Sequence, residues 1–144
     1  MTVANTLWDE LRRSIDGEVR ADNAALALYA ADASVYRQVP LGVVIPRHEG
    51  DVMRTLALAR ENRLPILARG GGTALAGQAC NAAIVLDFSK YMNSIRRIDA
   101  KRGLAVVEPG VVQAQLNAAV APEGLFFAPD PSTKDRSGVS AHET

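Results

Sequence analysis

The residues best suited to chemistry form one glycine-rich segment, Arg69-Gly-Gly-Gly-Thr-Ala-Leu-Ala-Gly-Gln78. Three consecutive glycines cost conformational entropy, so they indicate that backbone conformation or close approach matters there. Positive φ angles let successive backbone N–H groups point into one concavity, and the missing Cβ atoms let an anion reach them. Arg69, Thr73 and Gln78 add polar side chains that can complete the hydrogen bonds around such an anion. The pattern therefore predicts a phosphate-binding loop.

Two common nucleotide-binding fingerprints do not fit this segment. The dinucleotide pattern G-x-G-x-x-G matches at Gly70 and Gly72 but meets Leu75 where a third glycine is required. The P-loop spacing G-x-x-x-x-G runs from Gly72 to Gly77. Glutamine and alanine follow it, however, where lysine and a hydroxyl residue must hold phosphates and magnesium. An ATPase site is therefore disfavoured, and an ordinary flexible turn is the alternative interpretation of the glycines.

Composition limits the kinds of site that the chain can carry. The 16 basic and 16 acidic residues balance to a formal net charge of zero, so we expect no nucleic-acid partner. One cysteine and two histidines exclude an internal disulfide and disfavour a Cys/His metal centre, and we expect no bound metal. Because no apolar run approaches roughly 18 residues and no signal peptide is visible, we expect a cytoplasmic protein without a membrane span.

Helices and short strands in mixed order must position the loop. Thr6 is predicted to cap the first helix and Asp22 the second. Helices are predicted over residues 7–16, 23–31, 49–62 and 112–123, and strands over 43–45, 66–68, 84–86, 95–99 and 104–107. The strand–helix–strand order within residues 43–68 predicts a right-handed parallel crossover. The expected fold class is α+β, with a small mixed sheet flanked by helices.

The glycine-rich segment closely resembles the pyrophosphate loop of the PCMH-type, or vanillyl-alcohol-oxidase-like, FAD-binding domain. The resemblance covers residues 5–136 and is strongest to the branch of D-lactate dehydrogenases and glycolate oxidase subunits, which includes large FAD and iron–sulfur fusion proteins. Further matching segments, in order, are Asp32-Ala-Ser-Val-Tyr36, Pro40-Leu-Gly-Val-Val-Ile-Pro46, Leu86-Asp-Phe-Ser89, Val107-Glu-Pro-Gly110 and Phe127-Ala-Pro-Asp-Pro-Ser-Thr133. The resemblance implies the first subdomain of the PCMH-type fold.

The resemblance also implies which residues contact FAD. The cofactor-binding residues carried over are Arg69, Gly70, Gly71, Gly72, Thr73, Gly77, Gln78, Pro109, Gly110, Pro129, Asp130, Ser132 and Thr133. The first seven would surround the pyrophosphate, and the others would contact the cofactor further along. Without the family, a plain helix start at Pro109 is as good an interpretation as a cofactor contact, and a plain turn at Pro129 is the better one. Relatives that bind FAD covalently often carry histidine where Thr73 stands, so we expect non-covalent FAD.

Residues 137–144 match none of the family pattern, which continues with a glycine- and asparagine-rich loop, a second FAD subdomain and a substrate domain. We therefore divide the chain into residues 1–136, the N-terminal subdomain, and 137–144, a tail left by truncation, cloning or a frameshift. We find no catalytic acid–base pair. The resemblance implies a parent oxidoreductase that oxidises a D-2-hydroxy acid of the lactate or glycolate type, whereas this chain alone would be inactive and would hold FAD weakly or not at all.

Two other interpretations stay open. A non-catalytic nucleotide- or anion-binding module could keep the same fold without redox chemistry. A homodimer could form through the apolar surface that the missing subdomains would cover. For the loop itself, we expect Gly71→Val to abolish FAD binding with little effect on folding, because the new side chain would occupy the phosphate's approach path.

Overall fold

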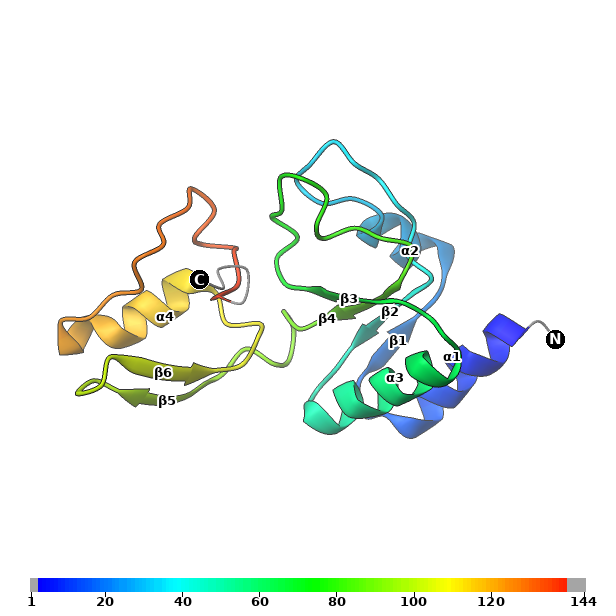
Figure 1. Ribbon diagram of the computed structural model, residues 1–144, viewed down its shortest axis with the longest axis horizontal. Helices are drawn as coiled ribbons and strands as arrows, with labels where there is room; N and C mark the ends of the chain where they lie inside the picture. The colour runs from blue at the N-terminus through cyan, green and yellow to red at the C-terminus, as the bar shows by residue number, and fades with distance from the viewer. Residues whose placement is uncertain (1–2, 140–144) are drawn as a thin grey trace.

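The computed structural model describes residues 3–139, which form a sheet unit and a hairpin unit joined by residues 88–94 (Figure 1). The sheet unit comprises α1 (Val3–Ser14), β1 (Glu18–Arg20), α2 (Asn23–Tyr29), β2 (Gly42–Ile45), α3 (Glu49–Glu61), β3 (Ile66–Arg69) and β4 (Ile84–Asp87). The hairpin unit comprises β5 (Ile95–Asp99), β6 (Leu104–Val107), α4 (Gln113–Val120) and the 3-10 turn η1 (Ala121–Glu123). None of these helices has the length and apolar character needed to cross a bilayer.

The sheet unit contains one mixed sheet with the strand order β1-β2-β4-β3. β2 and β3 both run parallel to β4, whereas β1 runs antiparallel to β2. β2 and β3, which α3 connects, are therefore not neighbours in the sheet, because β4 lies between them. β2 and β4 are buried along their whole length, as their uninterrupted apolar sequences predict. The expected α+β class with a small mixed sheet is confirmed.

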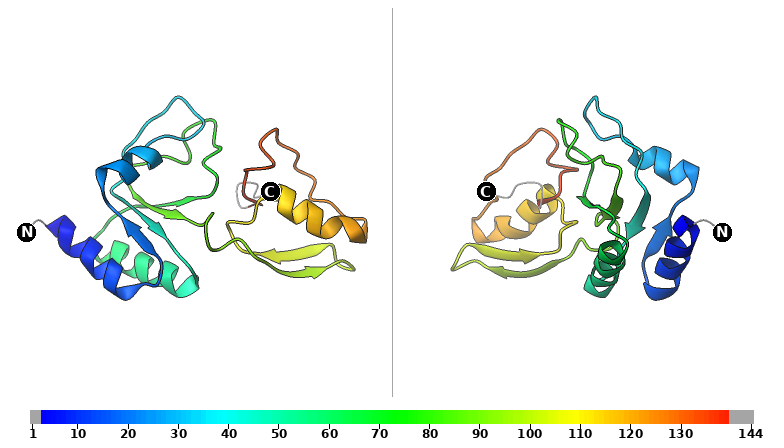
Figure 2. Two further views of the ribbon diagram at one scale, coloured as in Figure 1. Left: turned by 180° about the vertical axis from the view of Figure 1, so that it is seen from behind. Right: turned by 45° about the vertical axis from the view of Figure 1, so that its right-hand side comes forward.

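The two faces of this sheet are covered differently. α1 and α3 lie side by side on one face (Figure 2). The buried residues of that layer are Leu7, Trp8, Leu11, Val44, Leu58, Ala59, Ile84 and Leu86. Val43, Ile45 and Val85 point to the opposite face, where Tyr29 and Tyr91 pack on them. This alternation along β2 and β4 follows the period of two that strand geometry imposes.

The hairpin unit has its own small core. β5 and β6 pair antiparallel, and the predicted turn between them contains Gly103 with a φ of 62°. Val111, Leu116 and Val120 are buried between α4 and the hairpin. The predicted helix thus packs its apolar face on the predicted hairpin, and both predictions are confirmed.

Near the start of the chain one expectation is wrong and one strand is missed. α1 begins at Val3, so Thr6 lies inside the helix and does not cap it. The sequence does not predict β1, because three residues are too few to show a period of two, and only pairing with β2 extends them. The second cap is confirmed, since the Asp22 carboxylate accepts a hydrogen bond from the backbone N–H of Ala25 at 3.0 Å.

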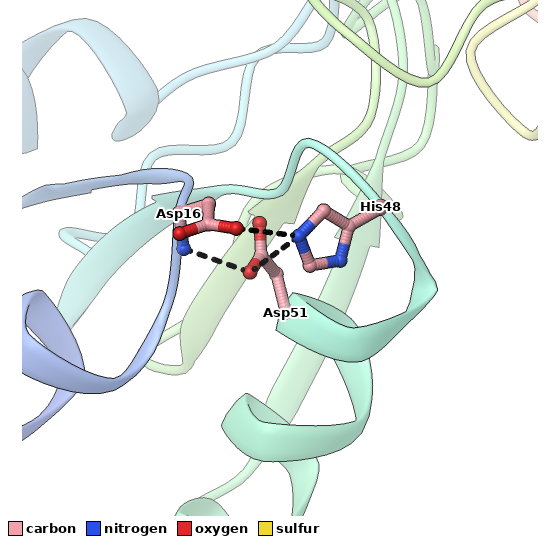
Figure 3. A group of neighbouring side chains, drawn as sticks. All are labelled: Asp16, His48 and Asp51. Carbon is pink, nitrogen blue, oxygen red and sulfur yellow. Dashed lines mark hydrogen bonds and ion pairs between the residues drawn. The ribbon is translucent and has the colours of Figure 1, made fainter.

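A buried carboxylate fixes the start of α3 to the turn after α1 (Figure 3). Asp51 is 2% exposed and accepts 2.9 Å hydrogen bonds from the backbone N–H groups of Asp16 and Arg47. The His48 ring lies above it, with Nε2 3.0 Å from Asp16 Oδ2 and 3.5 Å from Asp51 Oδ1. The hydrogen bond to Asp16 raises the pKa of His48. Both oxygens of Asp51 accept hydrogen bonds from the backbone. The cluster therefore has a structural role: it connects the turn after α1 to the start of α3.

Candidate functional site

A cavity of about 620 Å³ lies where the two units meet, within the size range of small-molecule sites. The sheet unit and the connection contribute residues 68–75, 78, 79 and 88 to its wall, and the remainder of the wall comes from residues 109, 131, 133, 137 and 138. A second cavity of about 330 Å³ adjoins it and is lined by residues 31–33, 69, 71–73, 133 and 136. The two share Arg69, Gly71, Gly72, Thr73 and Thr133. The glycine-rich loop therefore borders both cavities.

The backbone of the loop carries unused hydrogen-bond donors. Within residues 3–139, no backbone N–H of residues 70–75 donates a hydrogen bond to the protein. Two carbonyl groups of the loop, in contrast, accept hydrogen bonds that fix its backbone. Arg69 O accepts from Phe88 N at 3.1 Å, and Gly72 O accepts from Ala33 N at 3.1 Å. A run of free N–H groups beside a cavity is the arrangement that binds an anion without a nearby cation. The loop therefore fits a phosphate group.

The Arg69 side chain serves the loop itself. Its guanidinium donates to the carbonyl oxygens of Ala79 at 2.7 Å, Ala31 at 2.9 Å and Tyr29 at 3.3 Å, and it lies over the Tyr29 ring. These bonds join the two ends of the loop to each other and to the C-terminal end of α2. Sequence reasoning missed these bonds, because their acceptors are backbone atoms. A hydrogen bond from this side chain to an anion stays a prediction.

Each glycine of the loop has its own structural reason. A Cβ added to Gly70 would meet no atom within 4 Å, whereas one added to Gly71 would lie 2.1 Å from the carbonyl oxygen of Arg136. Gly72 has a φ of 65°, and an added Cβ would strike the Arg69 guanidinium. Positive φ therefore occurs at one glycine of the triplet and recurs at Gly77, with a φ of 81°. Gly70 is the triplet position that borders free space.

The second glycine motif lies at the joint between the units. Gly110 is buried, and its N–H donates to the carbonyl oxygen of Met92 at 2.8 Å. An added Cβ would lie 2.2 Å from the carbonyl oxygen of Phe88 and 2.7 Å from that of Met92. Glycine is therefore required for the hairpin unit to approach the connection after β4. Pro109, one residue earlier, lines the larger cavity.

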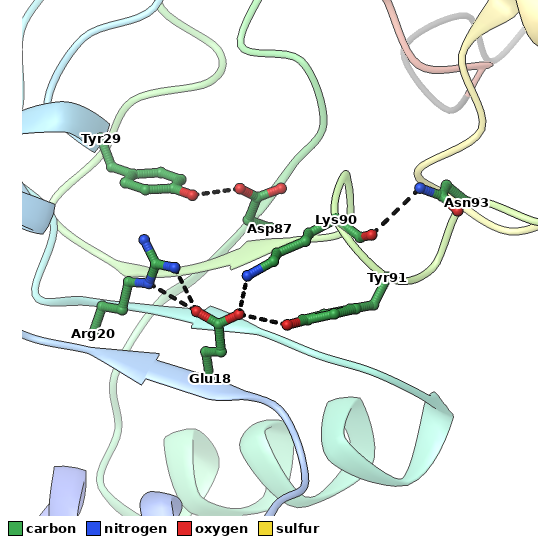
Figure 4. A network of polar contacts seen from close by, with 7 residues as sticks. All are labelled: Glu18, Arg20, Tyr29, Asp87, Lys90, Tyr91 and Asn93. Atoms are coloured by element: carbon green, nitrogen blue, oxygen red, sulfur yellow. Dashed lines mark hydrogen bonds and ion pairs between the residues drawn. The ribbon is translucent and has the colours of Figure 1, made fainter.

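A polar network holds that connection against the sheet (Figure 4). Glu18 on β1 accepts hydrogen bonds from Arg20, Lys90 and Tyr91, the last at 2.7 Å. The bonds from Lys90, Tyr91 and Arg20 lower the pKa of Glu18 to about 2. Because Lys90 and Tyr91 belong to the connection, this carboxylate fixes the path by which the chain leaves the sheet unit.

Asp87, at the end of β4, forms the other half of the network. Its carboxylate accepts hydrogen bonds from the Tyr29 hydroxyl at 2.5 Å, and from the backbone N–H and hydroxyl of Ser89 at 2.8 and 2.6 Å. Burial and the hydrogen bond to Asp87 raise the pKa of Tyr29 well above its usual range. The carboxylate thus joins α2 to the first turn of the connection, close to the larger cavity.

The structure brings most, but not all, of the sequence-predicted site residues together. Those that line at least one of the two cavities are Arg69, Gly70, Gly71, Gly72, Thr73, Gln78, Pro109 and Thr133. Those that line neither are Gly77, Gly110, Pro129, Asp130 and Ser132. Gly77 packs on the Tyr36 ring, and the exposed Asp130 pairs with Lys134 at 2.9 Å.

Ser137 and Gly138 are among the residues of the larger cavity's wall that sequence reasoning missed. Both lie in the predicted tail, and no local signal marks them. Ser137 is nevertheless 3% exposed, and its hydroxyl lies 3.1 Å from that of Thr73 and 2.6 Å from that of Thr133. Residues 140–144 of the predicted tail, including His142, lie outside the described residues.

Comparison with known proteins agrees with this geometry. Residues 40–142 match the FAD binding domain family, so the match includes positions beyond residue 136. D-2-hydroxyglutarate dehydrogenase of Pseudomonas putida is 40% identical over 126 residues, which are 85% of this chain and 12% of that protein. Glycolate oxidase subunit GlcD of Bacillus subtilis is 38% identical over 83% of this chain and 26% of its own length.

Solved structures share the fold. The 4-ethylphenol oxidase of Gulosibacter chungangensis superposes with a TM-score of 0.77 and 27% identity, over 94% of this chain and 27% of that one. An alkyldihydroxyacetonephosphate synthase superposes with a TM-score of 0.81 at 18% identity, over 95% of this chain and 30% of that one. The chain thus spans between about an eighth and a third of these similar proteins. It belongs to the FAD binding domain family, and its cofactor is FAD.

Proposed function

We propose that this chain holds the pyrophosphate of FAD in the larger cavity, through the backbone of the Arg69–Gln78 loop and the hydroxyls of Thr73 and Thr133. The observation that carries the proposal is the run of free N–H groups over residues 70–75 beside that cavity. Ionised phosphate oxygens only accept hydrogen bonds, so a stretch of the wall that offers free N–H donors suits them. The zero net charge of the chain agrees with recognition by backbone donors.

We further propose that the domain works within an oxidoreductase that oxidises a D-2-hydroxy acid. Support comes from the two relatives named above, a D-2-hydroxyglutarate dehydrogenase and a glycolate oxidase subunit. Bound FAD would supply the electron acceptor for that oxidation. The described wall of the larger cavity contains no carboxylate and no histidine to take the substrate's proton. This chain alone should therefore turn over no 2-hydroxy acid.

The attachment of the cofactor and the domain boundary are further parts of the proposal. We propose non-covalent FAD, because the described walls of both cavities contain no histidine, cysteine or tyrosine to carry a flavin bond. Acid precipitation of the loaded protein should leave all flavin in the supernatant. The boundary at residue 136 stays a prediction. Limited proteolysis tests it: cleavage directly after residue 136 would support the boundary. Protection of Ser137 and Val139, whose backbone atoms bond to Gln113 and Val111, would contradict it.

Calorimetric titration of the 144-residue chain tests the proposed role. FAD and ADP should bind, whereas riboflavin, which lacks both phosphates, should bind at least about tenfold more weakly, since one charge-assisted hydrogen bond is worth that factor. Equal affinities for riboflavin and FAD would contradict the phosphate contact. ADP binding as tight as FAD binding, with no flavin contribution, would instead favour the non-catalytic nucleotide-binding module.

A further inference from the structure

Three hydroxyl groups form a chain between the two units. Ser137 Oγ lies 3.1 Å from Thr73 Oγ1 on the glycine-rich loop and 2.6 Å from Thr133 Oγ1 on the opposite wall. Both threonines line both cavities, and the serine, which lines the larger cavity, is almost completely buried. We call this set the hydroxyl chain.

The backbone of Ser137 is fixed independently of its hydroxyl. Its N–H donates to Thr133 O at 2.8 Å, and its carbonyl accepts from Gln113 N, at the start of α4, at 3.0 Å. Two residues later, Val139 N donates to Val111 O at 2.8 Å. The middle of the hydroxyl chain is therefore anchored to the hairpin unit, and its hydroxyl reaches across to the loop of the sheet unit.

The hydrogen atoms of the hydroxyl chain can be counted. Each hydroxyl has one O–H donor, and two hydrogen bonds join the three groups. If the bonds run from Thr73 towards Thr133, the last O–H of Thr133 stays free, and in the reverse direction the free O–H belongs to Thr73. If both threonines donated to Ser137, its own buried O–H would lack an acceptor among the described residues. An unsatisfied buried donor costs about 1–3 kcal/mol, so this third arrangement is disfavoured.

We propose that the hydroxyl chain is a reversible donor to the phosphates: it offers one O–H to a phosphate oxygen of the ligand, from either the Thr73 end or the Thr133 end. This inference rests on the proposed function, because it concerns the same cavity. Reversing both hydrogen bonds moves the free donor from one wall to the other without moving a heavy atom. A diphosphate can thus be contacted on either side at the same backbone geometry.

The proposal predicts redundancy between the two threonines. In Thr73→Val the remaining pair, Ser137 and Thr133, still share one hydrogen bond and keep one free O–H, and the same holds in reverse for Thr133→Val. Each single variant should therefore change the dissociation constant for inorganic pyrophosphate or FAD by less than about threefold. The double variant loses both ends and one charge-assisted bond, so affinity should fall about ten- to hundredfold.

The experiment is calorimetric titration of wild type, both single variants and the double variant with FAD and with inorganic pyrophosphate. Ser94→Ala, an exposed serine that lines neither cavity, is the control and should bind as wild type does. In the double variant the buried Ser137 hydroxyl loses both of its hydroxyl partners. A triple variant that adds Ser137→Ala therefore removes the whole hydroxyl chain. It should regain thermal stability and keep the weak affinity of the double variant.

Three results would overturn the proposal. If the single effects multiply in the double variant, the two hydroxyls act independently. If the double and triple variants bind as wild type does, the hydroxyl chain does not contact phosphate, and only the part of the proposed function that rests on the loop backbone stands. If wild type binds neither FAD nor pyrophosphate, the proposed function fails as well.

Discussion

The same substitution at two neighbouring glycines should have opposite effects on stability. In Gly71→Ala the new Cβ would lie 2.1 Å from Arg136 O and 3.1 Å from its carbonyl carbon, both of them backbone atoms. Because such contacts do not occur below 3.0 Å, either the loop or the segment around residue 136 must move by about 1 Å. Overpacking of this kind costs about 1–3 kcal/mol, which at roughly 3 °C per kcal/mol for a chain of this length lowers Tm by about 3–9 °C.

Gly70→Ala is the matched control for that change. An added Cβ meets no atom within 4 Å, and the φ angle lies outside the left-handed region. Alanine at such a position stabilises a protein by about 0.4–1 kcal/mol, because it restricts the unfolded chain. Tm should therefore stay constant or rise slightly, while FAD affinity falls because Gly70 lines the cavity.

Differential scanning calorimetry and FAD titration on the two variants measure both effects. The structure corrects the expectation that substitution of Gly71 would spare folding, since its Cβ position is occupied by the backbone at Arg136. Substitution of Gly70, in contrast, should weaken FAD binding without lowering the stability of the fold. The reasoning would be refuted if the Tm of Gly71→Ala equalled that of wild type, or if the Tm of Gly70→Ala were several degrees lower.

Three other features give testable predictions. Glu18 has a pKa of about 2 in the folded protein and 4.5 as its reference value, so its contribution to stability is complete above about pH 4.5 and is lost as the pH falls towards 2. Glu18→Gln should therefore flatten the plot of unfolding free energy against pH in that window, measured by urea denaturation. The pKa of His48 is raised, so its stabilisation is complete below pH 6.5 and is lost as the pH rises through the folded pKa. Asp16→Asn should remove that loss. Gln113 is fully buried, and its side-chain amide has no hydrogen-bond partner among residues 3–139, so Gln113→Met should raise the unfolding free energy by about 1–2 kcal/mol in urea titrations.

Each of these has a contrary outcome. A Glu18→Gln curve parallel to wild type between pH 4.5 and 2 would mean that the network in Figure 4 does not form in solution. An unchanged neutral-to-alkaline slope in Asp16→Asn would show that Asp16 does not raise the pKa of His48. Destabilisation by Gln113→Met would show that the amide has a partner that the structure does not contain.

Local signals account for the parts of the fold that the sequence predicts. Asp22 caps α2, and α3 starts at Glu49 and ends before Asn62, because caps and acidic first turns act within a few residues. β1 is not predicted, because it exists only through pairing with β2, more than twenty residues later. Thr6 carries the right residue type for a cap, but the helix extends past it.

The candidate site likewise has one part that the sequence predicts and one part that depends on tertiary structure. The loop and its glycines are visible in the sequence because their types and spacing are unusual. The role of the Arg69 side chain is not visible, since it donates to carbonyl oxygens that carry no residue signature. Ser137 is missed for a similar reason: its place between Thr73 and Thr133 depends on how the two units meet.

The central claim is that the free N–H groups of residues 70–75 contact the FAD phosphates, and amide NMR measures this directly. A ¹⁵N-labelled sample of the chain is titrated with FAD to millimolar concentration, so that weak binding is also detected, and with riboflavin in parallel. FAD should shift the amide signals of residues 70–75 more than those of the distant turn at residues 101–103, and riboflavin should leave them in place. Unmoved loop signals at saturating FAD, or equal shifts with riboflavin, would contradict the account.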